Sequence, residues 1–219
     1  MLALTRTEDV VTMPREPITL SRLSDPKPDT ATEQEFETVR SWARNWLSKA
    51  HPDLGRNGPV CPFTGPSISK DLFLVSFVRG AAIDRDAMGE ILTEVARIFP
   101  GLPPEKGPEV VFKTVVLILP EVTDFQAIDS VQLEYKNLFI RSGLMVGQFY
   151  PGCPQEGLWN AAFKPLDAPL PMLAIRYMVS SDYPFLCGNE EWMRVYFSQF
   201  APDIPSRVRI DIIRRVTAA

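Results

Sequence analysis

Apolar residues follow two patterns along this chain, one with helical spacing and one as nearly continuous runs. Where an apolar residue recurs every three or four positions, the pattern predicts a helix with one face on the core. The nearly continuous runs predict strands that are covered on both faces of a sheet. The expected helices are residues 33–49, 85–99, 125–142, 190–200 and 206–216, and the expected strands are residues 71–78, 110–119, 144–150 and 172–179.

Residues suited to helix ends stand at the borders of these segments. Thr32, Asp84 and Asp124 each precede a helical pattern, where a side-chain oxygen can accept a hydrogen bond from the first turn. Gly143 follows the third helix, in the position that favours a left-handed backbone. The end signals therefore support the helix boundaries independently of the apolar spacing.

The order of helices and strands predicts one α+β domain. Its central sheet should have four or more strands and be covered by helices, because the strand segments are apolar on both faces. We assign residues 33–219 to this domain. Residues 1–32 are polar and contain four prolines, so we expect an extended N-terminal arm there.

Composition and charge exclude some partners. The chain has 219 residues with 23 basic and 27 acidic side chains, a net charge of -4, which argues against a nucleic-acid partner. No apolar run reaches the ~18 residues that a membrane span requires, so we expect no membrane partner. With no visible signal peptide and three unclustered cysteines, we expect a cytoplasmic protein with reduced thiols.

The loop between the first helix and the first strand is the richest in candidate chemistry. Residues 50–63 contain the only histidine, His51, and one of the three cysteines. His51 could bind a metal or haem iron through a neutral ring nitrogen. It could equally be a structural histidine that caps a helix end.

Cys61 has three interpretations that the sequence leaves open. Its thiolate could act as a nucleophile with His51 as the base, or as a soft iron ligand. It could also be a small apolar residue at the entrance of a strand. A zinc site that adds Cys153 and Cys187 is disfavoured, because the spacings match no ligand pair.

Five further residues are candidates for a binding or catalytic site. Arg56 lies in a glycine-bearing turn, where it could hold a carboxylate. Arg176 interrupts an apolar strand, so it either meets an anion or faces water at a sheet edge. Tyr150, Trp159 and Tyr177 make the second half of the chain aromatic, which suits a flat apolar ligand and equally an aromatic core.

Four segments resemble the signature of a bacterial domain family of uncharacterised function. They are residues 51–63, 143–150, 157–160 and 171–179, and the resemblance extends over about residues 35–205. More distantly, residues 60–63 and the order of the elements after them are similar to the YqcI/YcgG family. Some members of that family are haem-dependent enzymes that oxygenate amine nitrogen.

The resemblance implies a haem-binding oxidative enzyme that acts on an amine or amino acid in a biosynthetic pathway. His51 would then be the axial ligand, with Arg56 and Arg176 pairing with propionates or a substrate carboxylate. Tyr150 and Trp159 would wall the cofactor pocket, and Cys61 and Tyr177 are the candidate catalytic groups.

Two alternative functions stay open at this stage. One is an enzyme without haem that uses Cys61 and His51 on a small molecule. The other is a non-catalytic ligand-binding or accessory protein with a structural His51. A small-molecule substrate is the expected partner, with a homodimer as a second candidate.

Overall fold

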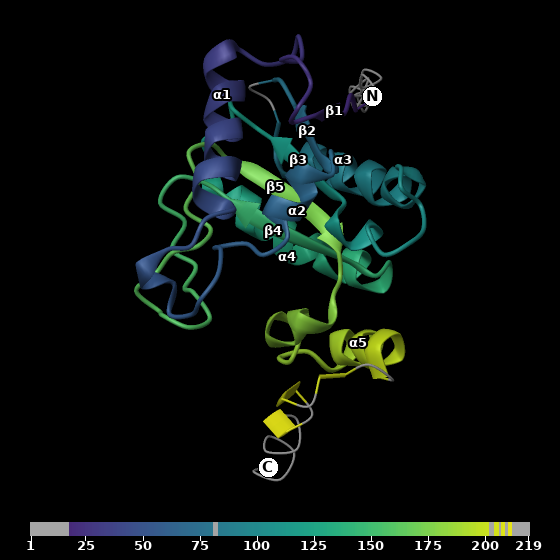
Figure 1. Ribbon diagram of the computed structural model, residues 1–219. Coiled ribbons are helices and arrows are strands. Elements are labelled where there is room, and N and C mark those ends of the chain that lie inside the picture. Colours follow the sequence, from purple (N-terminus) through teal and green to yellow (C-terminus); the bar gives the residue numbers. More distant parts are fainter. Residues whose placement is uncertain (1–17, 81–82, 202–203, 206, 209, 212–219) are drawn as a thin grey trace, which may run out of the picture.

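A five-stranded mixed sheet, with the strand order β1-β2-β3-β5-β4, runs through the centre of the protein (Figure 1). This computed structural model describes residues 18–80, 83–201, 204–205, 207–208 and 210–211. The strands are β1 (Ser21–Arg22), β2 (Phe73–Phe77), β3 (Thr114–Ile118), β4 (Leu144–Phe149) and β5 (Met172–Tyr177). The predicted α+β class with a central sheet of four or more strands is confirmed.

Helices connect and cover the strands. The α-helices are α1 (Glu33–Ser41), α2 (Thr64–Ser69), α3 (Arg85–Ile98), α4 (Phe125–Arg141) and α5 (Glu190–Phe200). A π-helix, η1 (Trp42–Leu47), continues α1, and the 3-10 helices are η2 (Pro52–Leu54), η3 (Phe99–Gly101), η4 (Val110–Phe112) and η5 (Ser180–Phe185). The expected caps are confirmed, because Thr32, Asp84 and Asp124 each accept a hydrogen bond from the first turn of their helix.

Strands β2 and β3, which follow each other in the chain, pair directly, whereas β5 is inserted between β3 and β4. β2 and β3 are parallel and are connected through α3, whereas β5 lies antiparallel between β3 and β4. In this register Val116 of β3 is opposite Ala174 of β5, and Ala174 is opposite Gly147 of β4. The strand at this edge of the sheet is therefore β4.

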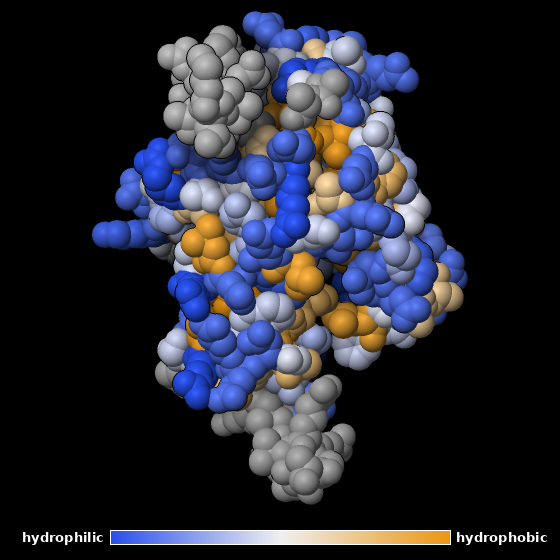
Figure 2. Space-filling view, turned by 180° about the vertical axis from the view of Figure 1, so that it is seen from behind, coloured by the Kyte–Doolittle hydropathy of each residue, from blue (hydrophilic) through white to orange (hydrophobic). Residues whose placement is uncertain are grey.

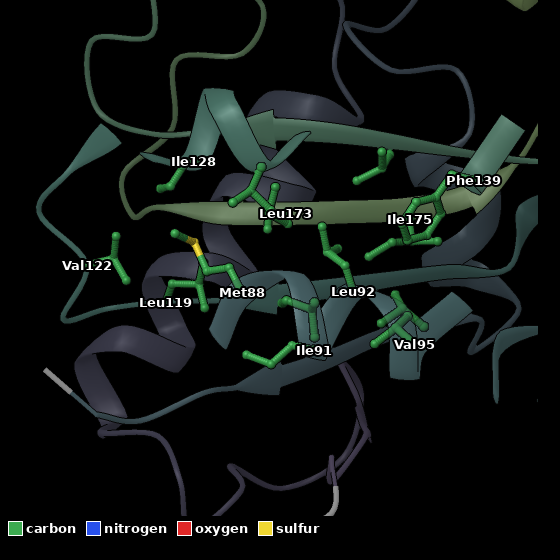
Figure 3. Packing of buried hydrophobic residues seen from close by; sticks show 14 of the residues in the cluster. Met88, Ile91, Leu92, Val95, Leu119, Val122, Ile128, Phe139, Leu173 and Ile175 are labelled. Atoms are coloured by element: carbon green, nitrogen blue, oxygen red, sulfur yellow. The ribbon is translucent and has the colours of Figure 1, made fainter. Parts of the chain in front are cut away.

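The two faces of the sheet carry separate hydrophobic clusters. Alternate residues of one strand point to opposite faces, so Leu117 joins one cluster and Val116 the other. Helices α3 and α4 cover the first face, where Met88, Leu92 and Phe139 meet β5 (Figure 3). Helix α1 and η1 cover the second face, as the continuous apolar strands predicted.

A third cluster joins the C-terminal elements to the body. Tyr196 of α5 is fully buried with Met178 and Ile140, and its hydroxyl donates to the main-chain oxygen of Ser180 at 2.6 Å. On the face of the molecule that Figure 2 shows, hydrophobic residues form small separate patches among hydrophilic ones. Helices α5 and η5 therefore pack against the end of the sheet as an attached layer (Figure 1).

Some boundaries differ from the sequence prediction. Within the expected arm, residues 21–22 pair with β2, and Leu23 is 1% exposed because its side chain completes the second-face cluster. The expected strand at 110–119 begins only at Thr114, since Lys113 is buried and its Nζ donates to Leu102 O at 2.5 Å. Residues 1–17 of the arm and 212–216 of the last expected helix lie outside the described residues.

Candidate functional site

The loop at residues 50–63 begins and ends against the same turn of η1. The main-chain N–H of Cys61 donates to Leu47 O, and that of Val60 donates to Lys49 O, both at 2.8 Å. These bonds join the end of the loop to the backbone at the end of η1. The candidate residues within it are therefore held in fixed positions.

Arg56 fills the interior of this loop. Its guanidinium donates to the main-chain oxygens of Asn57 at 3.0 Å, Pro59 at 2.9 Å and Val60 at 3.1 Å. A group that satisfies three carbonyls of its own loop stabilises that loop. In this arrangement Arg56 is a structural residue and is not placed to bind a carboxylate or a haem propionate.

His51 lies within an aromatic cluster at the start of η2. Its ring centroid is 4.9 Å from the rings of both Trp46 and Phe163, and its side chain is 28% exposed. Its Nδ1 accepts a hydrogen bond from the main-chain N–H of Asp53 at 3.2 Å. The neutral ring consequently carries its hydrogen on Nε2 and is a donor there.

This hydrogen bond bears on the expected role of His51 as a metal ligand. A histidine that binds a metal through Nε2 normally donates from Nδ1 to a carbonyl or carboxylate. In His51 the Nδ1 lone pair is already used, so Nε2 has no free lone pair in the neutral ring. In addition, the described residues contain no group of three or more His, Cys, Asp or Glu side chains that could hold a metal ion.

A second loop, residues 151–169, packs against the first (Figure 1). The amide of Asn160 donates to the main-chain oxygen of Asp53 at 2.8 Å. Gly55 has a φ of 76°, and a Cβ there would lie 2.8 Å from the main-chain oxygen of Trp159. Trp159 is itself 62% exposed, so its backbone braces the loops while its ring faces solvent.

An open groove of about 620 Å³ lies along α1 and η1, on the face of the sheet that these two helices cover. We call it the tryptophan groove; its lining residues are Gln34, Glu37, Thr38, Ser41, Trp42, Trp46 and Pro169. Both indole nitrogens are buried without a hydrogen-bond partner among the described residues. Trp46 also contacts His51, so the groove is continuous with the aromatic cluster. Short π-helical segments such as η1 are frequent at functional sites.

Arg176 is paired within the chain. Its guanidinium forms two hydrogen bonds with Asp182, at 2.6 and 2.8 Å, and lies over the ring of Phe63 at 4.9 Å. Asp182 is 2% exposed, and it also accepts from the main-chain N–H of Val179. Of the two alternatives for Arg176, an anion partner or a water-facing edge position, the structure shows the first: the anion is Asp182, and this pair joins β5 to η5.

Cys61 is half-buried and lies within electrostatic range of Arg176. Across the described parts of the chain, no hydrogen bond joins its thiol to His51. Because Nδ1 of His51 already accepts from Asp53, the ring is not oriented as a base toward Cys61. The expected nucleophile and base pair is therefore not assembled in this structure.

Tyr150 and Tyr177 lie on the opposite face of the sheet from His51. Tyr177 packs edge-to-face on Phe99, with ring centroids 5.2 Å apart, and burial raises the pKa of its hydroxyl. The Tyr150 hydroxyl donates to Asp129 at 2.7 Å. The sheet thus separates the expected site residues into two groups that cannot line one pocket.

Sequence reasoning missed several residues that the structure brings together. Trp42 and Trp46 lie within the helix expected at residues 33–49, and neither was proposed as a site residue. Asp129 and Gln132 were also missed, because polar residues three positions apart are ordinary on an amphipathic helix such as α4. Both residues line a cavity on the same face of the sheet as Tyr150.

The chain belongs to the family of the Domain of unknown function (DUF6875), whose model matches residues 36–211. This confirms the expected membership of an uncharacterised domain family; the similarity to the YqcI/YcgG family stays a prediction. No curated protein and no solved structure matches the chain. Within the described residues, no helix is long and apolar enough to cross a bilayer.

Proposed function

We propose that this protein binds a flat, largely apolar small molecule in the tryptophan groove. The observation that carries the proposal is one open groove lined from a single π-helical segment by the half-buried Trp46 and by Trp42, which is 7% exposed. Tryptophan rings offer a large contact area at a low cost in side-chain entropy. The function that we favour is thus the ligand-binding alternative.

The rim of the groove suits a ligand with a few polar atoms. Gln34, Thr38 and Ser41 supply an amide and two hydroxyl groups along one side, and Pro169 supplies an apolar surface. The carboxylate of Glu37 is paired with Arg40 at 2.5 Å. A mostly apolar wall with a small number of polar groups is typical of small-molecule sites.

His51 supports this site through packing. Its ring and that of Phe163 contact Trp46, and the Trp46 and Phe163 rings are stacked with centroids 5.7 Å apart. These contacts fix the orientation of Trp46 at the groove. His51 is a positioning residue in this proposal, and its Nε2 hydrogen is a donor.

The residues assigned to haem do not fit that group in this arrangement. His51 lacks a free Nε2 lone pair, Arg56 is bound to three carbonyls, and Arg176 is paired with Asp182. Haem-dependent oxidation of an amine or amino acid therefore stays a prediction of the resemblance. We also place the protein in the cytoplasm, because its three cysteines are too few and too scattered along the sequence to form a disulfide framework.

The proposal can be tested with acridone, a neutral flat tricycle, titrated into the full chain and followed by fluorescence anisotropy. We expect saturable binding that weakens roughly 3- to 10-fold in Trp46→Leu, because stacking on one ring is lost. Ser41→Phe, which narrows the groove at an exposed position, should weaken binding as well. Trp159→Leu removes an exposed tryptophan outside the groove and should bind acridone like the unmodified chain.

The same experiment can contradict the proposal. Acridone that does not saturate, or that Trp159→Leu weakens as much as Trp46→Leu, would remove the groove as a binding site. Haem added to the same protein tests the competing prediction. An absorption band that shifts on binding and is lost in His51→Ala would favour iron ligation over the groove.

A further inference from the structure

A cavity of about 400 Å³ lies on the opposite face of the sheet from the tryptophan groove. It forms where the first turns of α4 meet the end of β4 and the chain that follows. We call it the Asp129 cavity; it is lined by Asp129, Gln132, Leu133, Gln148, Tyr150, Cys153, Pro154, Gln155 and Glu156. Asp129, Gln132 and Leu133 share one helix face because they are three and four positions apart.

Asp129 is only partly satisfied by the protein. Its Oδ2 accepts the hydroxyl hydrogen of Tyr150 at 2.7 Å. Its Oδ1 is buried and has no hydrogen-bond partner among the described residues. A buried carboxylate oxygen without a donor is costly, so this atom is suited to receive a donor from a ligand.

Tyr150 is held rigidly beside this carboxylate. Its ring is stacked on Phe125 with centroids 4.9 Å apart, and its carbonyl accepts from the main-chain N–H of Cys153 at 3.1 Å. Burial, then the hydrogen bond to Asp129, raise the pKa of the Tyr150 hydroxyl. The hydroxyl therefore stays a donor to Oδ2, which leaves Oδ1 as the vacant acceptor.

The charge of the lining is negative. Asp129 and Glu156 are acidic, and no lysine, arginine or histidine is among the described lining residues. Glu156, at the exposed rim, faces Lys164 at 3.5 Å. An acidic lining without a basic residue is complemented by a cation, and a single unpartnered carboxylate oxygen suits an organic ammonium group.

We propose that the Asp129 cavity binds a small primary amine in its ammonium form. The ammonium group donates to Oδ1 of Asp129, the position that the protein leaves unsatisfied. The alkyl part packs against Leu133, which is 63% exposed, and Pro154. This site does not depend on the tryptophan groove, because the sheet lies between the two.

The test is a titration of the isotope-labelled full chain with butan-1-amine at neutral pH, followed by backbone amide NMR. We expect saturable shifts confined to the start of α4, the end of β4 and residues 151–156. Butan-1-ol, a neutral molecule of nearly the same shape, should bind ~10-fold more weakly or worse, because a charged donor is replaced by a neutral one. This comparison uses the unmodified chain and needs no variant.

Two matched variants locate the interaction. Asp129→Asn keeps the shape of the side chain but removes its charge, and it should lower the affinity for butan-1-amine ~10-fold or more. Glu134→Gln removes a carboxylate from the exposed side of the same helix and should leave the affinity unchanged. Both variants report their folding state in the same spectra.

Four results would overturn the proposal. They are equal binding of the amine and the alcohol, saturable shifts outside the cavity, a folded Asp129→Asn chain that keeps its affinity, and an absence of saturable shifts. If Asp129→Asn does not fold, the proposal is decided on the unmodified chain, by comparing the affinities for the amine and the alcohol and by the location of the shifted residues.

Discussion

The side-chain amide of Asn160 donates to the main-chain oxygen of Asp53 at 2.8 Å, across 107 residues of sequence. This bond ties the loop at residues 151–169 to the loop that contains His51. It is reinforced by the ring contact between His51 and Phe163. The two loops form one unit beside the tryptophan groove, so changes in either should affect both.

Removing the Asn160 amide should loosen this unit. We expect Asn160→Ala to lower the free energy of unfolding by about 1 kcal/mol, because Asp53 O loses its donor. Amide hydrogen exchange should accelerate in both loops and not in the sheet. Asn57→Ala is the matched control, since Asn57 takes part through its main-chain oxygen, which the variant keeps. Equal destabilisation by the two variants would contradict this account.

Gly55 should not tolerate a side chain. Its φ of 76° is strained for an L residue, and a Cβ would lie 2.8 Å from Trp159 O. We expect Gly55→Ala to reduce stability by about 2 kcal/mol or more in denaturant unfolding. Gly101→Ala is the control, because nothing lies within 4 Å of a Cβ there. Similar denaturant midpoints for Gly55→Ala and Gly101→Ala would contradict this prediction, because the two loops would then move apart at little cost in stability.

Stability should fall in acid partly through Glu35. A hydrogen bond from Arg79 is the largest cause that lowers the pKa of Glu35 from 4.5 to about 2. A group with a lowered pKa in the folded state stabilises above its unfolded pKa. That contribution is therefore present above pH 4.5 and is lost as the pH falls toward 2.

The variant Glu35→Gln tests this acid dependence. It keeps the capping contact to Thr32 but loses the charge, so the slope of stability between pH 4.5 and 2 should flatten. After allowance for solvent screening, the loss at neutral pH should be about 1–2 kcal/mol. Glu33→Gln, at an exposed position on the same turn, should keep the original slope. Unfolding midpoints measured across this pH range decide between the outcomes.

The Arg176 and Asp182 pair should hold the C-terminal layer to the sheet. Asp182 is 2% exposed, so Asp182→Ala leaves the guanidinium without its carboxylate in a mostly buried position. We expect a loss of about 2–3 kcal/mol in the free energy of unfolding, with faster exchange in η5 and α5. The exposed pair of Glu190 and Arg194 provides the control, and Glu190→Gln should have a far smaller effect. A stable Asp182→Ala chain with normal exchange would show that apolar packing alone fixes this layer.

The main elements of the fold could be predicted from the sequence because each depends on local signals. The caps at Asp84 and Asp124 and the positive φ of Gly143, at 70°, lie where the pattern placed them. β1 was missed because two residues carry no periodicity. The late start of β3 was missed because it depends on the burial of Lys113 against carbonyls of the preceding loop, at residues 100–104.

The site was harder to predict because the tertiary structure determines which groups each side chain hydrogen-bonds with. Arg56 and Arg176 were recognised as arginines that need acceptors, but their acceptors are loop carbonyls and Asp182. Nothing in the sequence shows which nitrogen of His51 accepts a hydrogen bond. The two faces of the sheet also separate Tyr150 from His51, which depends on strand order rather than on spacing.

The insertion of β5 between β3 and β4 has a consequence for biosynthesis. β4 leaves the ribosome before β5 and has no hydrogen-bonding neighbour until residues 172–177 emerge. During that interval β3 and β4 both present unpaired edges, which are templates for aggregation. Nascent chains that stall or are truncated between residues 150 and 171 should depend on chaperones far more than the complete chain does.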